Sequence, residues 1–227
     1  MTVQVCVAVP PKTVTEALDL IKQAEVQHAD LIEIRLDSLT DFEGIEKVAT
    51  SAKIPLIATN RSKDFGGNFS GNETERQQIL LTAAKSGFEY VDIDLCSPNQ
   101  AELVTMLHDL GTKVIISFHD FERTPSLHIL NNVLEAQINS GADVCKIVTT
   151  AKTMDDNMTT LRVVTRGSKK TKIVCFAMGE LGTPSRVLSA VFGGFFTFAC
   201  LDEKRKTAKG QLTIQEMQQA YALLGLQ

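Results

Sequence analysis

The sequence has no hydrophobic run long enough to cross a membrane. Its longest apolar stretches cover residues 3–9 and 193–201, whereas a transmembrane helix needs roughly 20 apolar residues. No basic region precedes the first stretch, so the N-terminus does not have the pattern of a signal peptide. These absences predict a cytoplasmic protein that has no membrane partner.

The sequence also lacks a basic stripe interleaved with aromatic residues. Its 23 basic and 27 acidic side chains give a formal net charge of −4, which argues against nucleic acid as a partner. Hydrophobic residues make up 44% of the chain and charged residues 22%. These fractions are ordinary for a globular protein and argue against disorder.

Closely spaced cysteine pairs are absent as well. The five cysteines are an odd number, and no two have the C-x-x-C spacing of a zinc or redox site. Cys6, Cys145 and Cys175 lie inside apolar runs, where we expect them to pack as small hydrophobic residues. The cysteines therefore give no indication of a zinc or redox site.

What the sequence does contain is a series of short apolar runs rich in β-branched residues. They are apolar nearly throughout rather than alternating, which is typical of parallel strands covered on both faces. Eight runs occur, at residues 3–9, 31–34, 55–59, 90–93, 114–118, 144–148, 173–176 and 195–199.

The segments between these runs have helical patterns. Thr13 precedes one of them, and Ser97 followed by Pro98 precedes another, as residues at helix starts do. Two apolar stripes have helical spacing, namely Leu103, Met106, Leu107 and Leu110, and then Ile214, Met217, Tyr221 and Leu224. Helix ends are predicted at Gly87, Gly111 and Gly141.

Eight strands that alternate with eight helices predict the α/β class and a single (β/α)8 TIM barrel over residues 1–227. The structural alternative is an open doubly wound sheet. A dinucleotide-binding sheet of that kind would have G-x-G-x-x-G after its first strand, where this chain has Pro10 and Pro11.

Two polar residues on these strands are candidates for catalysis, because functional groups of a barrel come from the C-terminal ends of its strands. Lys146 interrupts the sixth run. Burial would favour its neutral amine, which attacks a ketone to form an imine. A structural lysine paired with a carboxylate is the equal alternative.

His119 ends the fifth run and has the pKa range for moving protons, although a lone histidine more often caps a turn. Lys113 and Lys172 begin strands, where solvent is within reach.

Charged residues also stand near the ends of other strands. Glu33, Arg35 and Asp37 alternate along the chain, so we expect them to project to one side; the alternative is an internal salt-bridge network that occupies Arg35. Arg61 and Arg186 lie near two further strand ends. Arginine binds carboxylates through two parallel hydrogen bonds, so these residues indicate an anionic substrate, unless each is a surface charge.

With these residues identified, the chain resembles the type I 3-dehydroquinate dehydratase family over essentially its whole length. The matching segments occur in the expected order and fall on predicted strand ends. They are Glu33 to Arg35, Arg61-Ser62 with Gly66-Gly67, Tyr90 to Asp92, His119 to Phe121 with Thr124-Pro125, Lys146, Met178-Gly179 with Ser185-Arg186, and Gly210-Gln211.

The resemblance implies a lyase of the shikimate pathway, in aromatic amino acid biosynthesis, that converts 3-dehydroquinate to 3-dehydroshikimate without a metal. Lys146 would form a Schiff base with the substrate ketone, and His119 would be general acid and base in a syn elimination. Arg186 would pair with the substrate carboxylate. A homodimer is expected because the family often forms one. The remaining substrate-binding residues implied by the resemblance are Glu33, Arg35, Arg61, Thr207 and Gln211.

The chain departs from the family pattern at a few positions. Many bacterial members carry a glutamate four residues after the arginine of the third strand, where this chain has Phe65. The carboxylate neighbour of the histidine is therefore unassigned, with Asp64 and Asp92 as candidates. Residues 202–211 resemble a mobile lid, in which Thr207 replaces a common serine and Lys209 a common proline.

Two other functions stay open at the level of the sequence. One is another lysine-imine barrel, such as a class I aldolase or transaldolase. Those enzymes usually act on sugar phosphates, and no glycine-rich phosphate-binding turn follows the last two strands here. The other is a non-catalytic barrel that only binds a carboxylate ligand.

Overall fold

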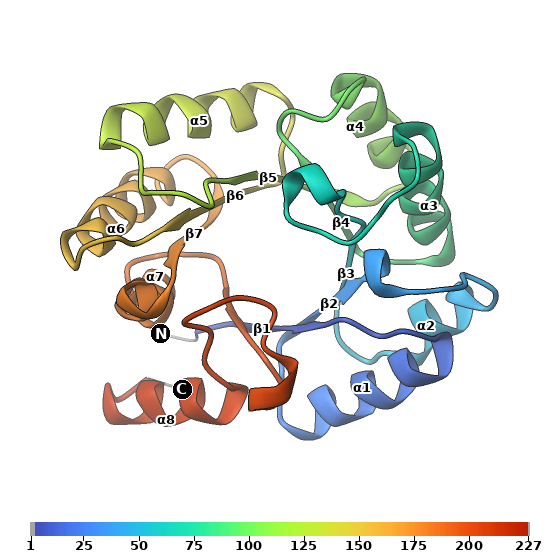
Figure 1. The fold of residues 1–227 in the computed structure, drawn as a ribbon, viewed down its shortest axis with the longest axis horizontal. Helices are drawn as coiled ribbons and strands as arrows, with labels where there is room; N and C mark the ends of the chain where they lie inside the picture. Colours follow the sequence, from blue (N-terminus) through green and yellow to red (C-terminus); the bar gives the residue numbers. More distant parts are fainter. Residues whose placement is uncertain (1–2, 227) are drawn as a thin grey trace.

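The computed structural model describes residues 3–226, in which eight strands alternate with eight α-helices (Figure 1). Residues 1–2 and 227, the ends of the predicted single domain, lie outside this description. The strands are β1 (Val5–Val9), β2 (Leu31–Arg35), β3 (Leu56–Thr59), β4 (Tyr90–Asp94), β5 (Lys113–His119), β6 (Val144–Thr150), β7 (Lys172–Met178) and β8 (Thr197–Ala199). The helices are α1 (Val14–Val26), α2 (Ile45–Ser51), α3 (Glu73–Ser86), α4 (Gln100–Asp109), α5 (Leu127–Asn139), α6 (Asp155–Gly167), α7 (Thr183–Val191) and α8 (Ile214–Leu223).

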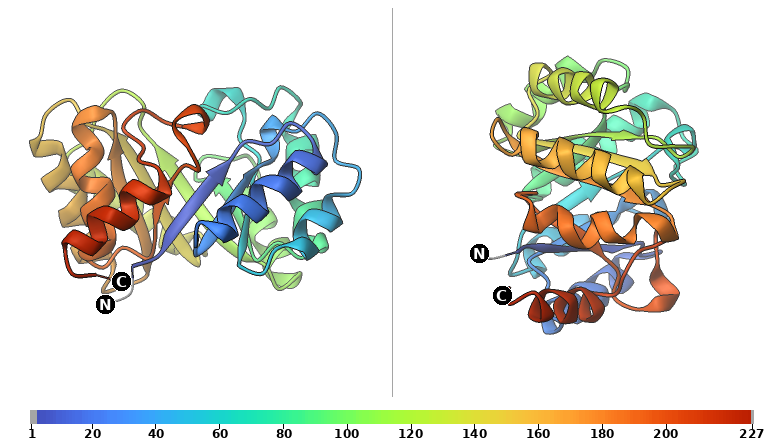
Figure 2. Two further views of the ribbon diagram at one scale, coloured as in Figure 1. Left: turned by 90° about the horizontal axis from the view of Figure 1, so that it is seen from below. Right: turned by 90° about the vertical axis from the view of Figure 1, so that its left-hand side faces the viewer.

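Four short 3-10 turns follow strands at one end of the fold. They are η1 (Leu36–Ser38), η2 (Lys63–Phe65), η3 (Glu180–Gly182) and η4 (Glu203–Arg205). Figure 2, left, shows η4 in red at the end toward which the strands point. This end is where the functional groups of a barrel are expected.

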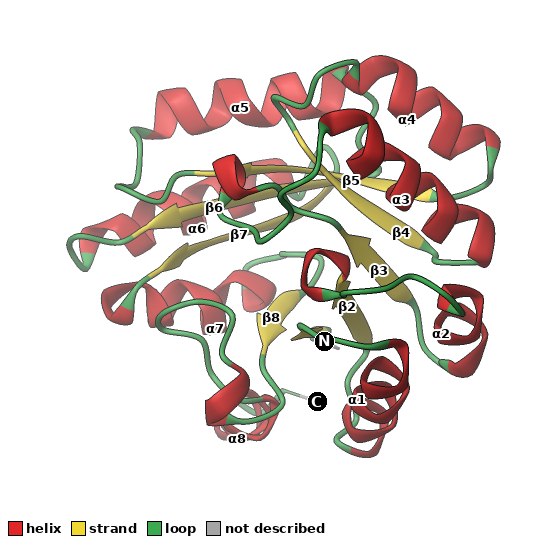
Figure 3. Cartoon of the chain, turned by 45° about the vertical axis from the view of Figure 1, so that its right-hand side comes forward, coloured by secondary structure: helices red, strands yellow, loops and turns green. Residues whose placement is uncertain are grey.

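The strands form one parallel sheet whose order follows the chain. Consecutive strands from β1 to β7 pair with one another, and β8 pairs with β1. Among the described residues β7 and β8 form no ladder, but the amide of Phe195 donates to the carbonyl of Ile173 in β7 at 2.7 Å. The result is a nearly closed inner ring of strands inside an outer ring of helices (Figure 3). The predicted (β/α)8 barrel and its eight strands are therefore confirmed, and the open doubly wound sheet is wrong.

Every second residue of each strand points into the barrel. Near the strand beginnings these inward positions are apolar and pack into a floor. Two positions further along, the inward columns of β2 to β6 become polar. The floor includes Cys6, Leu31, Ile57, Tyr90, Ile115, Val144, Val174 and Phe196; the polar level above it comprises Glu33, Thr59, Asp92, Ser117 and Lys146.

The outward-facing side chains pack against the helices. One cluster joins the outer faces of β1 to β5 with helices on that side of the barrel, and a smaller one joins β6 and β7 with α5 and α6. The helix signals in the sequence are largely confirmed. The Thr13 hydroxyl accepts a hydrogen bond from the Glu16 amide and caps α1. A glycine with positive φ follows α3, α4 and α5, at Gly87, Gly111 and Gly141.

The predicted cap of α4 is wrong, and its predicted buried face is confirmed only at Leu103 and Leu107. The helix begins at Gln100, and its start is not capped by Ser97. The Ser97 hydroxyl instead accepts a hydrogen bond at 2.8 Å from the buried guanidinium of Arg76 on α3. Met106 and Leu110, which the stripe places on the buried face, are 42% and 41% exposed. The buried guanidinium of Arg76 needs hydrogen-bond acceptors, and Ser97 serves it rather than capping α4.

The smaller predictions about buried and exposed side chains are confirmed at all but one position. In α8 the stripe is buried as predicted except at Leu224, which lies beyond the helix end and is exposed. Cys6, Cys145 and Cys175 are buried in the hydrophobic clusters, as expected. Lys113 and Lys172 are exposed, also as expected. No helix between residues 3 and 226 combines the length and apolar character of a membrane span.

The side chain of Gln137 connects α5 to the strands that carry the site. It is fully buried, and its Nε2 donates to the carbonyl oxygens of Ile116 in β5 at 3.0 Å and Lys146 in β6 at 2.8 Å. A buried polar group without a partner costs about 1–3 kcal/mol. Gln137 therefore fixes α5 against the barrel at the level of Lys146.

We expect Gln137→Met to lower the free energy of unfolding by about 2 kcal/mol. Methionine has a similar volume but cannot donate to the two carbonyl groups. Urea unfolding measures the change. Gln78→Met, at an exposed position of α3, is the matched control and should stay within about 0.5 kcal/mol of the parent protein. Equal stabilities of the two variants would show that the Gln137 hydrogen bonds contribute nothing.

Candidate active site

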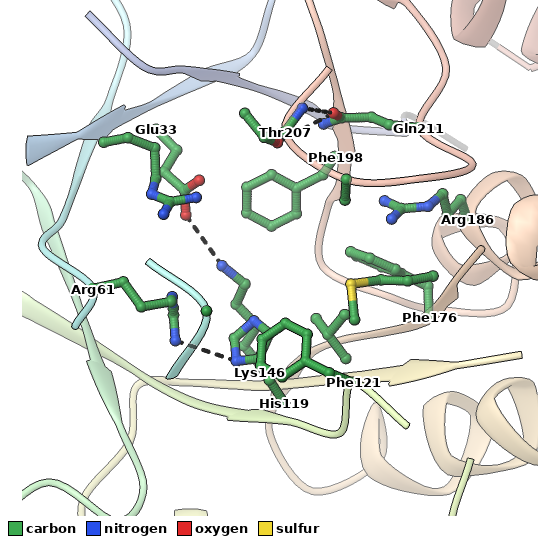
Figure 4. Close-up of a pocket in the computed structure, with 15 residues that line it drawn as sticks. Glu33, Arg61, His119, Phe121, Lys146, Phe176, Arg186, Phe198, Thr207 and Gln211 are labelled. Atoms are coloured by element: carbon green, nitrogen blue, oxygen red, sulfur yellow. Dashed lines mark hydrogen bonds and ion pairs between the residues drawn. The ribbon is translucent and has the colours of Figure 1, made fainter. Parts of the chain in front are cut away.

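One cavity opens at the C-terminal end of the barrel and is shown in Figure 4. It is bordered by side chains from β2, β5, β6, β7, α7 and the loops after β3 and β8. All eight residues predicted from the sequence line it, namely Glu33, Arg35, Arg61, His119, Lys146, Arg186, Thr207 and Gln211. The other lining residues are Gly66, Phe121, Val148, Phe176, Met178, Phe198 and Ala208.

Lys146 reaches from β6 into this cavity. Its side chain is only 6% exposed. The Nζ atom donates to Asp92 Oδ2 at 2.8 Å and to Glu33 Oε1 at 3.1 Å, and lies 4.3 Å from the centre of the Phe198 ring. Two carboxylates and an aromatic face therefore surround the amino group, and all three favour its charged form.

The expectation that burial makes Lys146 neutral is wrong for the free site. Burial lowers the pKa of Lys146, but the charges of Asp92 and Glu33 raise it by more, so the pKa lies above the ordinary lysine value. Burial raises the pKa of Asp92, but Lys146 and Arg61 together outweigh burial and hold this pKa below its ordinary value. The resting site thus holds an ammonium paired with carboxylates, as in the alternative interpretation of the sequence.

Arg61 lies directly after β3, at the centre of the polar half of the cavity. Its Nη2 donates to Asp92 Oδ1 at 2.8 Å and to Ser117 Oγ at 3.2 Å. Its Nη1 pairs with Asp94 and lies 3.2 Å from Nδ1 of His119. The side chain is 5% exposed, so the alternative of a surface charge is wrong. Burial lowers the pKa of Arg61, but its two aspartate partners raise it by more and keep the guanidinium charged.

His119 is the last residue of β5, and its ring lines the cavity. The ring stacks on Phe121 with the two ring centres 5.7 Å apart. The turn that follows β5 is capped by Asp120, whose carboxylate accepts hydrogen bonds from the amides of Glu122 and Arg123. His119 is therefore not the residue that caps this turn.

The surroundings of His119 favour its neutral form. Burial and the charges of Arg61 and Lys146 lower the pKa of His119 well below its ordinary value, while the charge of Asp92 opposes them. Of the two carboxylates considered as its neighbours, Asp64 is exposed and Asp92 acts on the ring only through its charge. Among the described residues no carboxylate forms a hydrogen bond with His119.

Glu33 and Arg35 face the cavity from β2, but Asp37 does not share their strand. β2 ends at Arg35, and Asp37 lies buried in η1, so the predicted alternation of three charges is wrong at its last member. The Asp37 carboxylate accepts from Arg35 Nε at 2.8 Å and Nη2 at 2.7 Å, and from the Asn68 amide at 3.0 Å. Glu33 Oε1 also accepts from Thr59 Oγ1 at 2.9 Å. Arg35 thus has a structural partner and lines the cavity as well.

Arg186, on α7, is a buried cation that faces no carboxylate partner within the described structure. The residue is 2% exposed, and its guanidinium carbon lies 4.4 Å from the centre of the Phe176 ring. Its Nε and Nη2 have no hydrogen-bond partner among the described residues. Burial lowers the pKa of Arg186 to about 10, so the side chain is still charged at neutral pH. A carboxylate ligand could accept hydrogen bonds from these two nitrogens.

The segment predicted as a lid, which follows β8, borders one side of the cavity through Thr207, Ala208 and Gln211. The amide and hydroxyl of Thr207 donate to Gln211 Oε1 at 2.8 and 3.1 Å. The amide of Gly179, after β7, donates to the carbonyl of Lys209 at 3.1 Å. A Cβ atom at Gly210 would collide with the carbonyl group of Gly179, so the close approach requires glycine there. These contacts seat the segment against the loop that follows β7.

Asp92 and Asp94 belong to the site, but Asp92 was considered only as a neighbour of His119 and Asp94 was not predicted at all. They occupy alternate positions at the end of β4, the same signal that identified Glu33 and Arg35. The aromatic wall of Phe176 and Phe198 had no comparable signal, because the sequence of an inward apolar residue is the same in a packed floor and in a cavity wall.

The carboxylates around the cavity are paired with cations. Between residues 3 and 226 no group of three or more His, Cys, Asp and Glu side chains is arranged to hold a metal ion.

Comparisons with known proteins identify the family of the chain. A family model described as type I 3-dehydroquinase matches residues 5–227. The chain belongs to the type I 3-dehydroquinase family. Membership confirms the resemblance recognised in the sequence and the prediction of an enzyme of the 3-dehydroquinate dehydratase type.

Individual relatives match over nearly the whole chain. A 3-dehydroquinate dehydratase from Desulfotalea psychrophila is 35% identical over 222 residues, which cover 96% of this chain and 97% of the relative. One from Methanococcus maripaludis is 34% identical over 224 residues, covering 97% and 99%. The crystal structure of 3-dehydroquinate dehydratase from Geobacillus kaustophilus has a TM-score of 0.90 at 24% identity and covers 99% of this chain and 92% of its own. This structural match supports the barrel fold.

The low pKa of His119 makes the stability of the fold depend on pH. The unfolded chain takes up a proton near the ordinary histidine pKa of 6.5, whereas the folded protein resists protonation there. The contribution is therefore present above about pH 6.5 and is lost as the pH falls below it. Between about pH 7 and pH 5 we expect His119 to lower the free energy of unfolding by roughly 1 to 2 kcal/mol.

Urea unfolding of the parent protein and of His119→Asn at both pH values measures this contribution. Asparagine does not titrate, so the variant should lose less stability on acidification. Asp37 and Asp92, whose pKa values are lowered by their cationic partners, titrate below this window and do not disturb the comparison. An identical loss in both proteins would mean that folded His119 titrates like a histidine in water.

Proposed function

We propose that this chain removes water from 3-dehydroquinate to give 3-dehydroshikimate through a Schiff base on Lys146, with His119 as general acid and base. The dehydratase activity follows from the family, and the residue roles rest on the site. The observation that carries them is that an ammonium, a neutral imidazole and an unpaired guanidinium line one cavity. The reaction belongs to aromatic amino acid biosynthesis.

Lys146 has to lose a proton before it attacks the ketone. Its Nζ already donates to Asp92 and Glu33, so a carboxylate can accept that proton without moving. The neutral amine then forms a bond to the ketone carbon, and a proton passes from the attacking nitrogen to the ketone oxygen, which becomes a hydroxyl. Return of the proton from the carboxylic acid lets this hydroxyl leave as water, which leaves a protonated imine on Lys146.

The protonated imine makes the neighbouring carbon of the substrate acidic. The register of β5 and β6 pairs Ser117 with Lys146, so His119 stands one inward position closer to the cavity mouth. In its neutral state His119 can take a proton from that carbon. The resulting enamine expels the hydroxyl group, which leaves as water with the proton held by His119. Hydrolysis of the product imine frees Lys146.

Arg186 is the residue that fits the substrate carboxylate, because its buried donors lack protein partners. It stands beside the apolar wall formed by Phe176 and Met178. The polar groups on the other side of the cavity would bind the substrate hydroxyls, and the segment after β8 would close over the ring. The residues in these roles are Glu33, Arg35, Arg61, Thr207 and Gln211.

The organisation of the whole protein follows the same proposal. We expect one catalytic domain over residues 1–227, a homodimer, a cytoplasmic location, and no metal or other cofactor. Size-exclusion chromatography with light scattering measures the oligomeric state directly.

Treatment with 3-dehydroquinate and borohydride should add the reduced substrate to Lys146, located by mass spectrometry of peptides. We expect Lys146→Ala to reduce turnover by at least ~10³-fold while the protein stays folded, because no other amine replaces the nucleophile. An adduct formed only with a sugar phosphate would support an aldolase instead. No adduct with any ketone would support a barrel that only binds carboxylates.

Two control variants separate the lost nucleophile from the lost ion pair. Lys146→Arg keeps a cation beside Glu33 and Asp92 but cannot form an imine, so it should be as inactive as the alanine variant. Lys113→Ala removes a lysine that pairs with Glu89 at the opposite end of the barrel and should retain activity. Near-normal turnover by either Lys146 variant would exclude covalent catalysis at this position.

Arg186→Ala should raise KM at least ~30-fold, with a smaller effect on kcat. The reason is the loss of about 2 kcal/mol or more from a buried, charge-assisted pair with the carboxylate. Steady-state kinetics measure both constants. Arg162→Ala, at an exposed position of α6, is the matched control. A KM that stays unchanged in Arg186→Ala would place the carboxylate elsewhere in the cavity.

A further inference from the structure

The contact between Arg61 and His119 determines which nitrogen of the His119 ring carries a hydrogen. Arg61 Nη1 lies 3.2 Å from His119 Nδ1. An arginine side chain has only N–H donors and keeps its proton in proteins. Nδ1 is therefore the acceptor in this hydrogen bond, and a neutral ring that accepts at Nδ1 carries its hydrogen on Nε2.

The guanidinium is held in the orientation that makes this contact. Nη2 donates to Asp92 at 2.8 Å and to Ser117 at 3.2 Å, while Nη1 also pairs with Asp94. Asp94 in turn lies 3.9 Å from the guanidinium of Arg76. Arg76 is buried and bound by Glu73 at its Nε and Nη2. A chain of ion pairs thus runs from α3 to the imidazole and fixes the plane of Arg61.

The other nitrogen of the ring is left for a ligand. Nε2 of His119 has no hydrogen-bond partner between residues 3 and 226, and the ring lines the cavity. Phe121 stacks on the ring and limits its rotation. With Nδ1 bound to Arg61, the Nε2 hydrogen is the donor that the ring offers to a ligand in the cavity.

We propose that Arg61 is a positioning residue that sets the tautomer of His119, so that the free enzyme presents a neutral ring with its hydrogen on Nε2 to the substrate. This inference rests on the catalytic role proposed for His119. The Nε2 hydrogen can bind the ketone oxygen and polarise the carbonyl group for attack by Lys146, with no proton transferred in that step. Proton removal by Nε2 requires the opposite tautomer. The contact with Arg61 therefore favours imine formation, and His119 acts as the base only after its ring has changed tautomer, once the imine has formed.

The charges around the ring agree with a neutral tautomer. Three cations face it, namely Arg35 from β2, Arg61 after β3 and Lys146 from β6, whereas Asp92 from β4 is the carboxylate that opposes them. Burial acts in the same direction as the cations and lowers the pKa of His119. The ring is therefore uncharged at neutral pH, and its single hydrogen is placed by the contact with Arg61.

Long-range proton–nitrogen correlation spectra of protein labelled with 15N-histidine report the tautomer directly. The chain has four histidines, and the signals lost in His119→Asn identify His119. At neutral pH the parent protein should show hydrogen on Nε2 and an unprotonated Nδ1. A ring that carries its hydrogen on Nδ1, or on both nitrogens, would overturn the inference. This measurement is made on the parent protein and does not depend on the folding of any Arg61 variant.

Two substitutions test whether Arg61 is the cause. Arg61→Lys keeps a cation that can only donate, so the Nε2 hydrogen should remain. Arg61→Gln can either donate or accept, so the population with hydrogen on Nδ1 should rise, and the rate of borohydride trapping on Lys146 should fall at least ~10-fold below that of the lysine variant. An unchanged tautomer in the glutamine variant would contradict a role for Arg61.

The same experiments separate this inference from the proposed function. If the Nε2 hydrogen is observed but Lys146 is never trapped with 3-dehydroquinate, the tautomer assignment stands and the covalent mechanism fails. If Lys146 is trapped but the hydrogen lies on Nδ1, the mechanism stands and the role assigned to Arg61 fails.

Discussion

A charge removed from water needs an opposite charge beside it, and this requirement organises the mouth of the barrel. The pairs are not independent, because Asp92 is shared by Lys146 and Arg61. Removing one member leaves its partners buried and uncompensated, so such networks fix positions more than they add stability. The network comprises the cations Lys146, Arg61 and Arg35 and the carboxylates Glu33, Asp92, Asp94 and Asp37.

Arg186 is the exception to this pairing, and this exception is the basis of the proposal that the cavity selects an anion. The polar network occupies the side of the cavity formed by β2 to β6, whereas the side near Arg186 is apolar and aromatic. The face of Phe176 offers the guanidinium partial compensation, but two of its nitrogens have no hydrogen-bond partner in the described structure. The unfavourable free energy of an incompletely bonded cation is incurred on folding. A carboxylate ligand relieves it, which gives that ligand an advantage that a neutral molecule lacks.

The sequence predicts the features that depend on local patterns and misses those that depend on distant partners. All eight strands could be predicted because their runs are apolar. Lys146 interrupts such a run and His119 ends one, whereas Thr207 and Gln211 came only from the family resemblance. The charge of Lys146 could not be predicted, since Asp92 and Glu33 lie 54 and 113 positions away in the chain. The same limit explains the error at Ser97, whose hydroxyl is taken by Arg76 from another helix. Asp37 was misplaced because the chain turns out of the strand just after Arg35.

The charged state of the resting lysine is compatible with covalent catalysis once the charge of the intermediate is considered. A protonated imine carries its positive charge on the nitrogen that was the ammonium of Lys146. Asp92 and Glu33 already face that nitrogen, so in the proposed mechanism they would stabilise the intermediate without rearranging, which is the condition for effective electrostatic catalysis. The negative charges of these two carboxylates also raise the pKa of the free lysine and make its deprotonation harder. The two effects have one cause: a site that stabilises the cationic imine also keeps the lysine protonated, and it places the acceptors of that proton within hydrogen-bonding distance.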